Sequence, residues 1–316
     1  MLQSQEQKER FLASWHHVNR LGKVVVNHVS FFVAVAIAIT SLSGAADEPQ
    51  GTLKKIIGSR MIRLGYQKDV RPFSFAGVDG KPSGYSIELC QRIVAGIRNE
   101  FALAALDAKW IEVTSNDRFQ RVADGTIDLE CAASAITLTR LKQVDFSAMI
   151  WIGSKTFLVK RGHSLKTQGD LTGKKVAVVE GTTTERELRE LLLGQVLGSN
   201  HVTTDILLVK DRQEGLDAVV RGSVYAFAGD RTVLAALAFT APDTEQLVLA
   251  DYQFSYEPYA LTLRRNDADF RFAVNQVLAN LYRSGEVKEI YNRWFGKLGS
   301  PPPLLESLYE LNGLRN

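Results

Sequence analysis

The chain has 316 residues, of which 45% are hydrophobic and 23% charged, a composition that excludes a disordered or collagen-like protein. Its length leaves room for about two domains. The formal net charge is +3, and the first 46 residues, with four basic and two acidic side chains, contribute two of these charges. The remaining 34 basic and 33 acidic residues nearly balance, so we expect no nucleic acid partner, which would need a clustered basic surface.

The first 46 residues have the pattern of a secretory signal peptide. Basic residues, the last of them Lys23, precede the apolar stretch VSFFVAVAIAI at 29–39, and small residues follow it. A largely apolar stretch of eleven residues is short for a membrane span, which needs about 20. We expect cleavage after Ala45 or Ala46 and export of the rest across a membrane. An uncleaved membrane anchor is the alternative.

Strand-like and helix-like stretches alternate along the rest of the chain. The pattern predicts strands at 61–66, 109–114, 126–134, 155–161, 174–181, 205–210, 223–230 and 261–267. It predicts helices at 84–102, 116–125, 184–197, 211–222 and 269–284. Such alternation is typical of an α/β fold with mostly parallel sheets that helices cover on both faces. The three prolines at 301–303 are expected to stop the preceding helix and to force an extended crossing.

Two cysteines remain beyond the export signal. Cys90 falls on a predicted helix and Cys131 near the end of a predicted strand, so contact between them is feasible. In an exported protein the two can form a disulfide. The alternative is a pair of buried thiols that pack as small apolar residues.

The motifs of common catalytic and metal sites are missing from the sequence. There is no C-x-x-C, H-E-x-x-H, G-x-x-x-x-G-K-[ST], G-x-S-x-G or G-x-G-x-x-G. Beyond residue 46 only His163 and His201 remain, both in polar turns. We therefore expect no metal and no cofactor, and a protein that holds a ligand instead of cleaving one.

Five fragments, in a fixed order, carry a family resemblance. They lie at 71–93, 113–147, 171–191, 226–236 and 284–296. Together they resemble the extracytoplasmic solute-binding proteins of polar amino acid ABC transporters, over residues from about 51 to about 303. The NDR and LEC motifs within the second fragment make the glutamate/aspartate-binding branch (family 3) the most similar.

The resemblance implies a fold and a working cycle. The fold is the two-lobed periplasmic-binding-protein fold (type II), in which each lobe is a mostly parallel sheet flanked by helices and a two-strand hinge joins the lobes. Lobe 1 would comprise 51–151 plus 258–316, lobe 2 would comprise 152–257, and crossovers would lie near 151–156 and 254–260. The protein would act in the periplasm as a monomer, binding an amino acid ligand for the membrane permease of an ABC importer.

A free amino acid needs one partner for each of its charges, because burying an unpaired ion costs several kcal/mol. The resemblance assigns Arg140 to the ligand α-carboxylate, where a guanidinium offers two parallel donors. It assigns Asp230 to the α-ammonium. The alternatives are a surface arginine at the start of a helix and an N-cap for the helix after Asp230, which is compatible with ligand contact.

Three further residues are assigned to carboxylates of the ligand. Thr182 and Thr183 follow a strand and a glycine, and backbone N–H groups at a helix N-terminus attract anions. Simple helix capping, with Thr184 as the N-cap, is the alternative. Arg118 matches the arginine that the acidic amino acid branch directs at the ligand side chain, the alternative being an exposed arginine like Arg121.

Aromatic walls are also implied near the first strand. Tyr66 ends that strand and Phe73 lies in the following loop, where family members often hold aromatic rings against the ligand. Core packing is the alternative for Phe73.

The sequence departs from the glutamate/aspartate branch at one charged position. Gln67 stands where the branch has a second arginine, so a ligand side-chain carboxylate would lose a charged partner. Lys68 or Arg71 could compensate.

It also departs at two hydroxyl positions. Ala133 and Ala135 stand where the branch has hydroxyl residues that touch the ligand, a loss of about 0.5–1.5 kcal/mol for each hydrogen bond. Ser134 does not replace them, because alternate strand residues face opposite sides. The ligand can therefore be glutamate, aspartate or another polar amino acid.

Two other functions remain open. Some proteins of this architecture are small-molecule dehydratases that use a carboxylic acid in the cleft, and Glu180, Glu185 or Glu257 could take that role. A solute-sensing module that reports to another membrane protein is the second alternative.

Overall fold

The computed structural model describes residues 48–196, 203–241 and 244–315. The expected signal peptide or anchor at 1–46 lies outside these residues, as does His201. Within the described ranges, no helix combines the length and the apolar character needed to cross a membrane.

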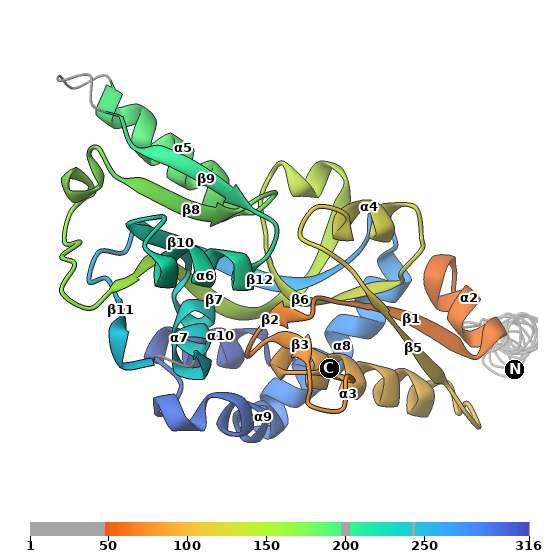
Figure 1. Cartoon of the computed structure of the whole chain (residues 1–316). Helices are drawn as coiled ribbons and strands as arrows, with labels where there is room; N and C mark the ends of the chain where they lie inside the picture. The colour runs from red at the N-terminus through yellow and green to blue at the C-terminus, as the bar shows by residue number, and fades with distance from the viewer. Residues whose placement is uncertain (1–47, 197–202, 242–243, 316) are drawn as a thin grey trace, which may run out of the picture. The chain divides into compact units, whose positions relative to one another are not determined.

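A mixed sheet of nine strands forms the centre of the region from Gln50 onward (Figure 1). Eight strands follow one path, in the order β5 (Asp107–Glu112), β1 (Met61–Tyr66), β6 (Leu129–Ala135), β12 (Ser255–Arg264), β7 (Val144–Lys160), β10 (Ala226–Asp230), β8 (Lys175–Val179) and β9 (Asp205–Val209). The ninth, β11 (Leu247–Leu249), pairs with β7. A small separate sheet contains β2 (Asp69–Val70), β3 (Ser74–Ala76) and β4 (Pro82–Ser83).

Parallel pairing occurs at both ends of the large sheet and antiparallel pairing at its centre. Strand β1 runs parallel to β5 and β6, and β8 runs parallel to β9 and β10. The long strands β7 and β12 are antiparallel to each other, and also to β10 and β6 respectively. The expected crossovers at 151–156 and 254–260 lie on this central pair, where Trp151 faces Tyr259 and Ser154 faces Tyr256.

Helices cover both faces of the sheet, as the alternating pattern predicts. At the β5 end, one large cluster of buried side chains joins the sheet to α2 (Gly51–Ser59), α3 (Tyr85–Glu100), α8 (Ala268–Ser284), α9 (Glu286–Phe295) and α10 (Pro303–Asn312). The opposite face of that end packs on α4 (Arg118–Ala123). At the β9 end, α5 (Thr183–Val196) covers one face, and α6 (Arg212–Arg221) and α7 (Arg231–Thr240) cover the other.

Strand β8 shows why a strand that is covered on both faces has a continuous run of apolar residues in the sequence. Its Val176 and Val178 belong to the cluster under α5, whereas Ala177 and Val179 belong to the cluster under α6 and α7. Alternate residues face opposite sides of a sheet, so a strand that is covered on both sides needs apolar residues throughout.

The predicted strands and helices all correspond to observed elements, but the prediction for the C-terminal tail is wrong in part. Pro302 is extended, as expected, yet Pro303 begins α10. Proline is favoured in the first turn of a helix because its missing N–H would have no partner there. The apolar residues Leu305 and Leu308 then bury one face of α10 in the large cluster.

Several short elements were not predicted. They are α2, β2, β3, β4, β11 and the 3-10 helices η1 (Arg140–Lys142), η2 (Gln168–Leu171), η3 (Thr244–Gln246) and η4 (Gly296–Leu298).

Cys90 and Cys131 form a disulfide between α3 and β6, so the thiol alternative does not apply. Their Cα atoms are 6.2 Å apart and both residues are fully buried. Because the bond closes a loop across a sequence separation of 41 residues, loop-closure entropy gives it a stabilising effect of about 4 kcal/mol.

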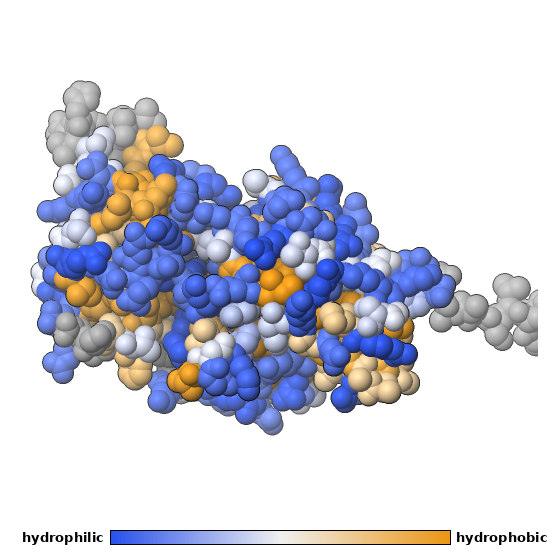
Figure 2. All heavy atoms as spheres, turned by 45° about the vertical axis from the view of Figure 1, so that its right-hand side comes forward, coloured by the Kyte–Doolittle hydropathy of each residue, from blue (hydrophilic) through white to orange (hydrophobic). Residues whose placement is uncertain are grey.

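The surface in Figure 2 is mostly hydrophilic, with hydrophobic side chains in scattered groups. Exposed apolar residues at single positions are normal for a folded protein.

Candidate functional site

A cavity of about 600 Å³, including its open mouth, lies between side chains from both ends of the large sheet. Gln67, Ala135, Val179 and Asp230 line it, and each lies at or just after the carboxyl end of a strand. This is the edge at which open α/β sheets bind ligands.

Eight of the ten predicted ligand-binding residues line this cavity. The β5 end of the sheet supplies Gln67, Arg118, Ala133, Ala135 and Arg140, and the β9 end supplies Thr182, Thr183 and Asp230. These residues are spread over more than 160 positions of sequence, and only the fold brings them together.

Tyr66 and Phe73 do not line the cavity, contrary to the expected aromatic walls. The Tyr66 ring lies edge-on to Trp110, with centroids 6.4 Å apart. Phe73 is fully buried, and its ring packs against Trp151 at 5.2 Å and Phe295 at 5.5 Å. Phe73 therefore belongs to the core because its ring fills the space between the sheet and α9.

Arg140 presents a guanidinium to the cavity from η1, the short helix after β6. Its Nη1 donates to the backbone oxygen of Ala135 at 2.8 Å, and its Cζ lies 4.5 Å from the centre of the Phe119 ring. Burial lowers the pKa of Arg140. Among the described residues no carboxylate forms an ion pair with it, so its charge is available to a bound anion.

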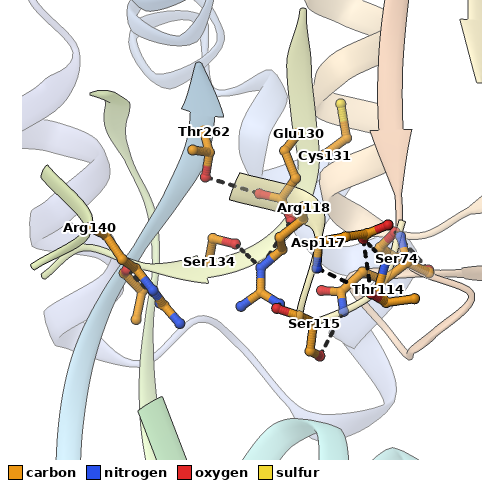
Figure 3. Close-up of polar contacts among 12 residues, drawn as sticks. Ser74, Thr114, Ser115, Asp117, Arg118, Glu130, Cys131, Ser134, Arg140 and Thr262 are labelled. Carbon is orange, nitrogen blue, oxygen red and sulfur yellow. Dashed lines mark hydrogen bonds and ion pairs between the residues drawn. The ribbon is translucent and has the colours of Figure 1, made fainter. Parts of the chain in front are cut away.

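Arg118 points toward the same region as Arg140 in the close-up of Figure 3. It is only 4% exposed, which contradicts the alternative of a surface arginine, whereas Arg121 forms a partly exposed ion pair with Asp117. Its Nε donates to Ser134 Oγ at 3.2 Å and its Nη1 to the Ser115 backbone oxygen at 2.7 Å. These bonds hold the guanidinium in one orientation.

The electrostatics of Arg118 are unusual. Burial, together with the nearby positive charge of Arg140, lowers the pKa of Arg118 to about 9. The group therefore remains charged at neutral pH, while a bound anion would stabilise that charge further.

Asp230 ends β10 and faces the cavity from the other end of the sheet. Its Oδ1 accepts a hydrogen bond from the Val233 backbone N–H at 2.9 Å, which makes it the N-cap of α7. Its Oδ2 accepts from the Tyr259 hydroxyl at 2.8 Å. Burial raises the pKa of Asp230. Because a carboxylate oxygen has two lone pairs, capping leaves room for a further donor.

Thr182 and Thr183 lie where β8 turns into α5. The Glu185 N–H donates to Thr182 Oγ1 at 3.2 Å, so Thr182, and not Thr184, caps the helix. The Thr183 hydroxyl accepts from Lys155 Nζ at 2.7 Å and donates to Glu257 Oε2 at 2.8 Å. Since both hydroxyls are engaged within the protein, this corner offers the cavity mainly the backbone N–H groups of the helix terminus.

The backbone conformation and the close packing at Gly181, just before the two threonines, require a glycine. Its φ of +73° lies in the left-handed region that glycine favours, and a Cβ atom there would collide with Asn116 Oδ1. The glycine thus allows α5 to begin close to the segment that carries Arg118.

Gln67 is 3% exposed, and its Nε2 donates to Ser115 Oγ at 3.1 Å. Neither proposed substitute for its missing charge lines the cavity. Lys68 forms an ion pair with Glu112 at 2.8 Å, and Arg71 stacks over the Phe75 ring at 3.6 Å. The compensating role expected for Lys68 or Arg71 is therefore not supported by their positions.

Lys155 and Arg212 line the cavity but were missed in the sequence. Lys155, on β7, is 1% exposed, and its Nζ lies 2.7 Å from Glu257 and 3.1 Å from Glu187. Lys155 begins the predicted strand 155–161, which also contains two further basic residues, so its burial had no distinct signal in the sequence.

Arg212 begins α6 and contacts Asp69 on β2, a strand of the small separate sheet that follows β1 in the chain. Its backbone N–H donates to Asp69 at 3.0 Å, and its Nη1 lies 3.1 Å from the same carboxylate. Burial opposes ionisation of Asp69, but the charge and hydrogen bonds of Arg212 outweigh it and lower the pKa of Asp69. This pair ties α6 to the small sheet beside the cavity.

Glu257, one of three carboxylates considered for acid catalysis, is engaged by Lys155 and Thr183. Burial raises its pKa. Glu180 is exposed and bonds with Asn116, and Glu185 accepts from the Gly181 N–H. Among the described residues, none of the three lines the cavity.

Comparisons with known proteins show the family of the chain. The sequence profile of the bacterial extracellular solute-binding proteins, family 3, matches residues 62–297. An L-glutamate/L-aspartate-binding protein of Pseudomonas aeruginosa is 35% identical over 83% of this chain and 85% of its own length. A glutamate/aspartate import solute-binding protein of Salmonella typhimurium is 31% identical over 83% of this chain and 84% of its own.

A solved structure extends the comparison to the fold. The crystal structure of an ancestral amino acid-binding protein, a precursor of cyclohexadienyl dehydratase, has a TM-score of 0.67 and 27% identity, and covers 78% of this chain and 100% of its own. The predicted two-lobed, type II periplasmic-binding-protein fold is confirmed. The chain therefore belongs to family 3 of the bacterial extracellular solute-binding proteins.

Proposed function

We propose that the protein binds a free polar amino acid, glutamate or aspartate first among them, and delivers it in the periplasm to the membrane permease of an ABC importer. One observation carries the proposal. Arg140, which has no ion-pair partner among the described residues, and Asp230, a partly buried aspartate, line one cavity from opposite ends of the sheet. The names of the relatives from Pseudomonas aeruginosa and Salmonella typhimurium support the ligand class.

The two charges of an amino acid match these two residues. Arg140 takes the α-carboxylate, aided by the backbone N–H groups at the start of α5, and Asp230 takes the α-ammonium. Each ion then keeps a partner of opposite charge when water leaves the cavity, which offsets the cost of burial.

Arg118 receives the side chain of the ligand. A guanidinium has five N–H donors, and hydrogen bonds to Ser134 and Ser115 use two of them. Gln67, Ala133 and Ala135 supply no second cation and no hydroxyl, so the ligand is held by fewer polar contacts than in the glutamate/aspartate branch.

Ligand capture involves motion of two lobes. Lobe 1 comprises 51–151 plus 258–316, lobe 2 comprises 152–257, and the segments 151–156 and 254–260 of β7 and β12 act as the hinge. Ligand that contacts both lobes shifts the population toward the closed form, which the permease recognises. In this proposal the protein works as a monomer and performs no catalysis.

The test is isothermal titration calorimetry of the purified protein against the common amino acids, together with mass spectrometry of any ligand released on denaturation. We expect heat with glutamate, aspartate or a related polar amino acid, and little with apolar ones. If no amino acid gives heat and none is released, the proposal is incorrect. Prephenate and arogenate, assayed for turnover, test the dehydratase alternative.

A further inference from the structure

A buried carboxyl group, Glu130 on β6, lies behind Arg118 (Figure 3). Its exposed fraction is 0%, and its Oε2 accepts a hydrogen bond from the Thr262 hydroxyl at 3.0 Å. Its Oε1 lies 3.9 Å from Arg118 Nε and has no hydrogen-bond partner among the described residues. An ionised carboxylate with one oxygen unsatisfied is costly in the interior, so burial favours the protonated form of Glu130, whereas the nearby Arg118 favours the ionised form.

The groups around Glu130 define what can change its charge. Arg118 on α4 and Arg140 on η1 are the two cations that face it, and both favour ionisation. The strand β12 contributes the Thr262 hydroxyl, its own strand contributes Ser134, and the facing residue of β1 is Gly65. Burial acts in the opposite direction and raises the pKa of Glu130.

We propose that Glu130 sets which side chain the cavity accepts, because it competes with the ligand side chain for the charge of Arg118. Ionised Glu130 neutralises Arg118 and leaves a site for an uncharged amide side chain, as in glutamine. Protonated Glu130 leaves Arg118 free to bind a carboxylate, as in glutamate. This inference rests on the proposed function and assigns Glu130 as a positioning residue behind the side-chain subsite.

Binding of glutamate is therefore linked to the uptake of a proton. With glutamate bound, one buried cation stands between two carboxylates, and two carboxylates that share a site are not both readily ionised. The proton comes from solvent and resides on Glu130, so the pKa of Glu130 is higher in the glutamate complex than in the free protein. Glutamine brings no second carboxylate and requires no proton.

This proton uptake determines how the affinity for glutamate depends on pH. The affinity for glutamate rises as the pH falls, by up to tenfold for each pH unit between the pKa of Glu130 in the free protein and its pKa in the complex. Protonation of Asp230 at lower pH acts in the opposite direction, because it removes the partner of the ligand ammonium. That loss applies to glutamate and glutamine alike, so the ratio of the two affinities isolates Glu130.

Other titrating groups near the cavity do not distinguish the two ligands. Lys155 pairs with Glu187 and with Glu257, and Glu257 also accepts a hydrogen bond from the Thr183 hydroxyl. Among the described residues the single histidine is His163, which stacks on Tyr225. The side-chain carboxyl of free glutamate, with a pKa near 4.3, stays ionised above about pH 5.5.

The first experiment uses the unaltered protein. Calorimetric titrations with glutamate and with glutamine, at about pH 7.5 and in two buffers of different ionisation enthalpy, count the protons taken up. We expect uptake approaching one proton with glutamate and none with glutamine, and a glutamate-to-glutamine affinity ratio that rises toward about pH 5.5. Equal proton counts and a ratio independent of pH would overturn the assignment.

The second experiment replaces the carboxyl by a neutral isostere. In Glu130→Gln we expect the glutamate-to-glutamine affinity ratio at neutral pH to equal the ratio that the unaltered protein reaches only at low pH. Glutamate should then bind this variant without proton uptake, and the ratio should not depend on pH. Glu112→Gln, at an exposed carboxylate on β5, is the matched control and should behave like the unaltered protein. A pH-dependent ratio that persists in Glu130→Gln would assign the proton to another group.

The outcomes separate this inference from the proposed function. If neither ligand binds, the proposed function fails, and the inference fails with it. If glutamate binds without a proton and Glu130→Gln leaves the ratio unchanged, the inference alone fails. Should Glu130→Gln not fold, the proton count of the unaltered protein still decides.

Discussion

The two walls of the cavity differ in how their charges are balanced. Among the residues that the structure describes, the wall at the β5 end presents Arg140 without an ion pair and Arg118 with a 3.9 Å contact to Glu130. In the wall at the β9 end, Lys155 is matched at short range by Glu187 and Glu257, and Asp230 is the acidic group that faces the cavity. The first wall thus presents positive charge to the cavity and the second presents negative charge. Together they complement the two opposite charges of a zwitterion.

The difference also concerns rigidity. The disulfide joins the β5-end elements α3 and β6, and β6 carries Ala133 and Ala135 into the cavity. At the β9 end the described residues contain no such link, and the connection to the first wall runs through β7, β12 and the ion pair of Asp69 with Arg212. In the lobe motion proposed above, the first wall would be the platform and the second would move against it.

Removing the uncompensated cation should have the largest effect. Arg140→Ala deletes two charge-assisted hydrogen bonds to the ligand carboxylate, and we expect the affinity to fall by about 10²- to 10⁴-fold. Calorimetry with the ligand identified in the panel measures this. Arg121→Ala, at a partly exposed arginine paired with Asp117, is the control and should bind normally. Equal affinities in the two variants would contradict the role given to the first wall.

Breaking the disulfide should weaken the platform without changing its charges. With Cys90→Ser and Cys131→Ser together, we expect the free energy of unfolding to fall by about 2–5 kcal/mol, because the unfolded chain regains the freedom of the closed loop. Urea unfolding of both proteins, with and without a thiol reductant, measures the change. The reductant should lower the stability of the unaltered protein and leave that of the variant unchanged. If the oxidised protein and the variant were equally stable, this would be evidence against the bond.

Neutralising the anion of the second wall should reduce affinity by less than removing Arg140. Asp230→Asn keeps a good N-cap for α7 but removes the charge opposite the ligand ammonium, so we expect binding about 10- to 100-fold weaker with little loss of stability. Asp211→Asn is the matched control, because Asp211 caps α6 in the same way, by accepting from the Glu214 N–H at 2.9 Å, and does not line the cavity. If both variants bind equally well, Asp230 acts only as a cap.

The ion pair between the walls should have the smallest effect. Arg212→Ala removes a partly buried contact that is worth about 1 kcal/mol, and we expect affinity to fall about three- to tenfold. Arg189→Ala, which breaks only a pair with Glu185 within α5, should leave affinity unchanged.

The contribution of the ion pair between Arg212 and Asp69 to stability should depend on pH in a predictable direction. Because the pKa of Asp69 is lowered in the folded protein, its contribution is complete above the ordinary aspartate pKa near 3.9 and is lost as the pH falls through the lowered value. The difference between Arg212→Ala and the unaltered protein, measured by thermal unfolding, should therefore vanish only in strong acid. A difference that already disappears at neutral pH would exclude Asp69 as the titrating group.

The sequence by itself determined the elements and much of the site. Periodicity predicted β1 to the residue and most helices within two or three positions, since one apolar face for each helix and apolar runs for doubly covered strands are local properties. Strand alternation also indicated that Ser134 faces away from Ala133 and Ala135, and the structure places it against Arg118. Arg140 and Asp230 could be named because their sequence contexts carry the family pattern.

Tertiary structure alone decided which charges remain available at the cavity. Three contacts between elements far apart in the chain decide this. Lys155 forms an ion pair with Glu257, Arg212 contacts Asp69 across 143 positions, and Glu130 lies behind Arg118. It also placed Phe73 in the core instead of the cavity wall. Burial and pairing of a side chain are set by what packs on it from elsewhere, and a linear pattern does not contain that information.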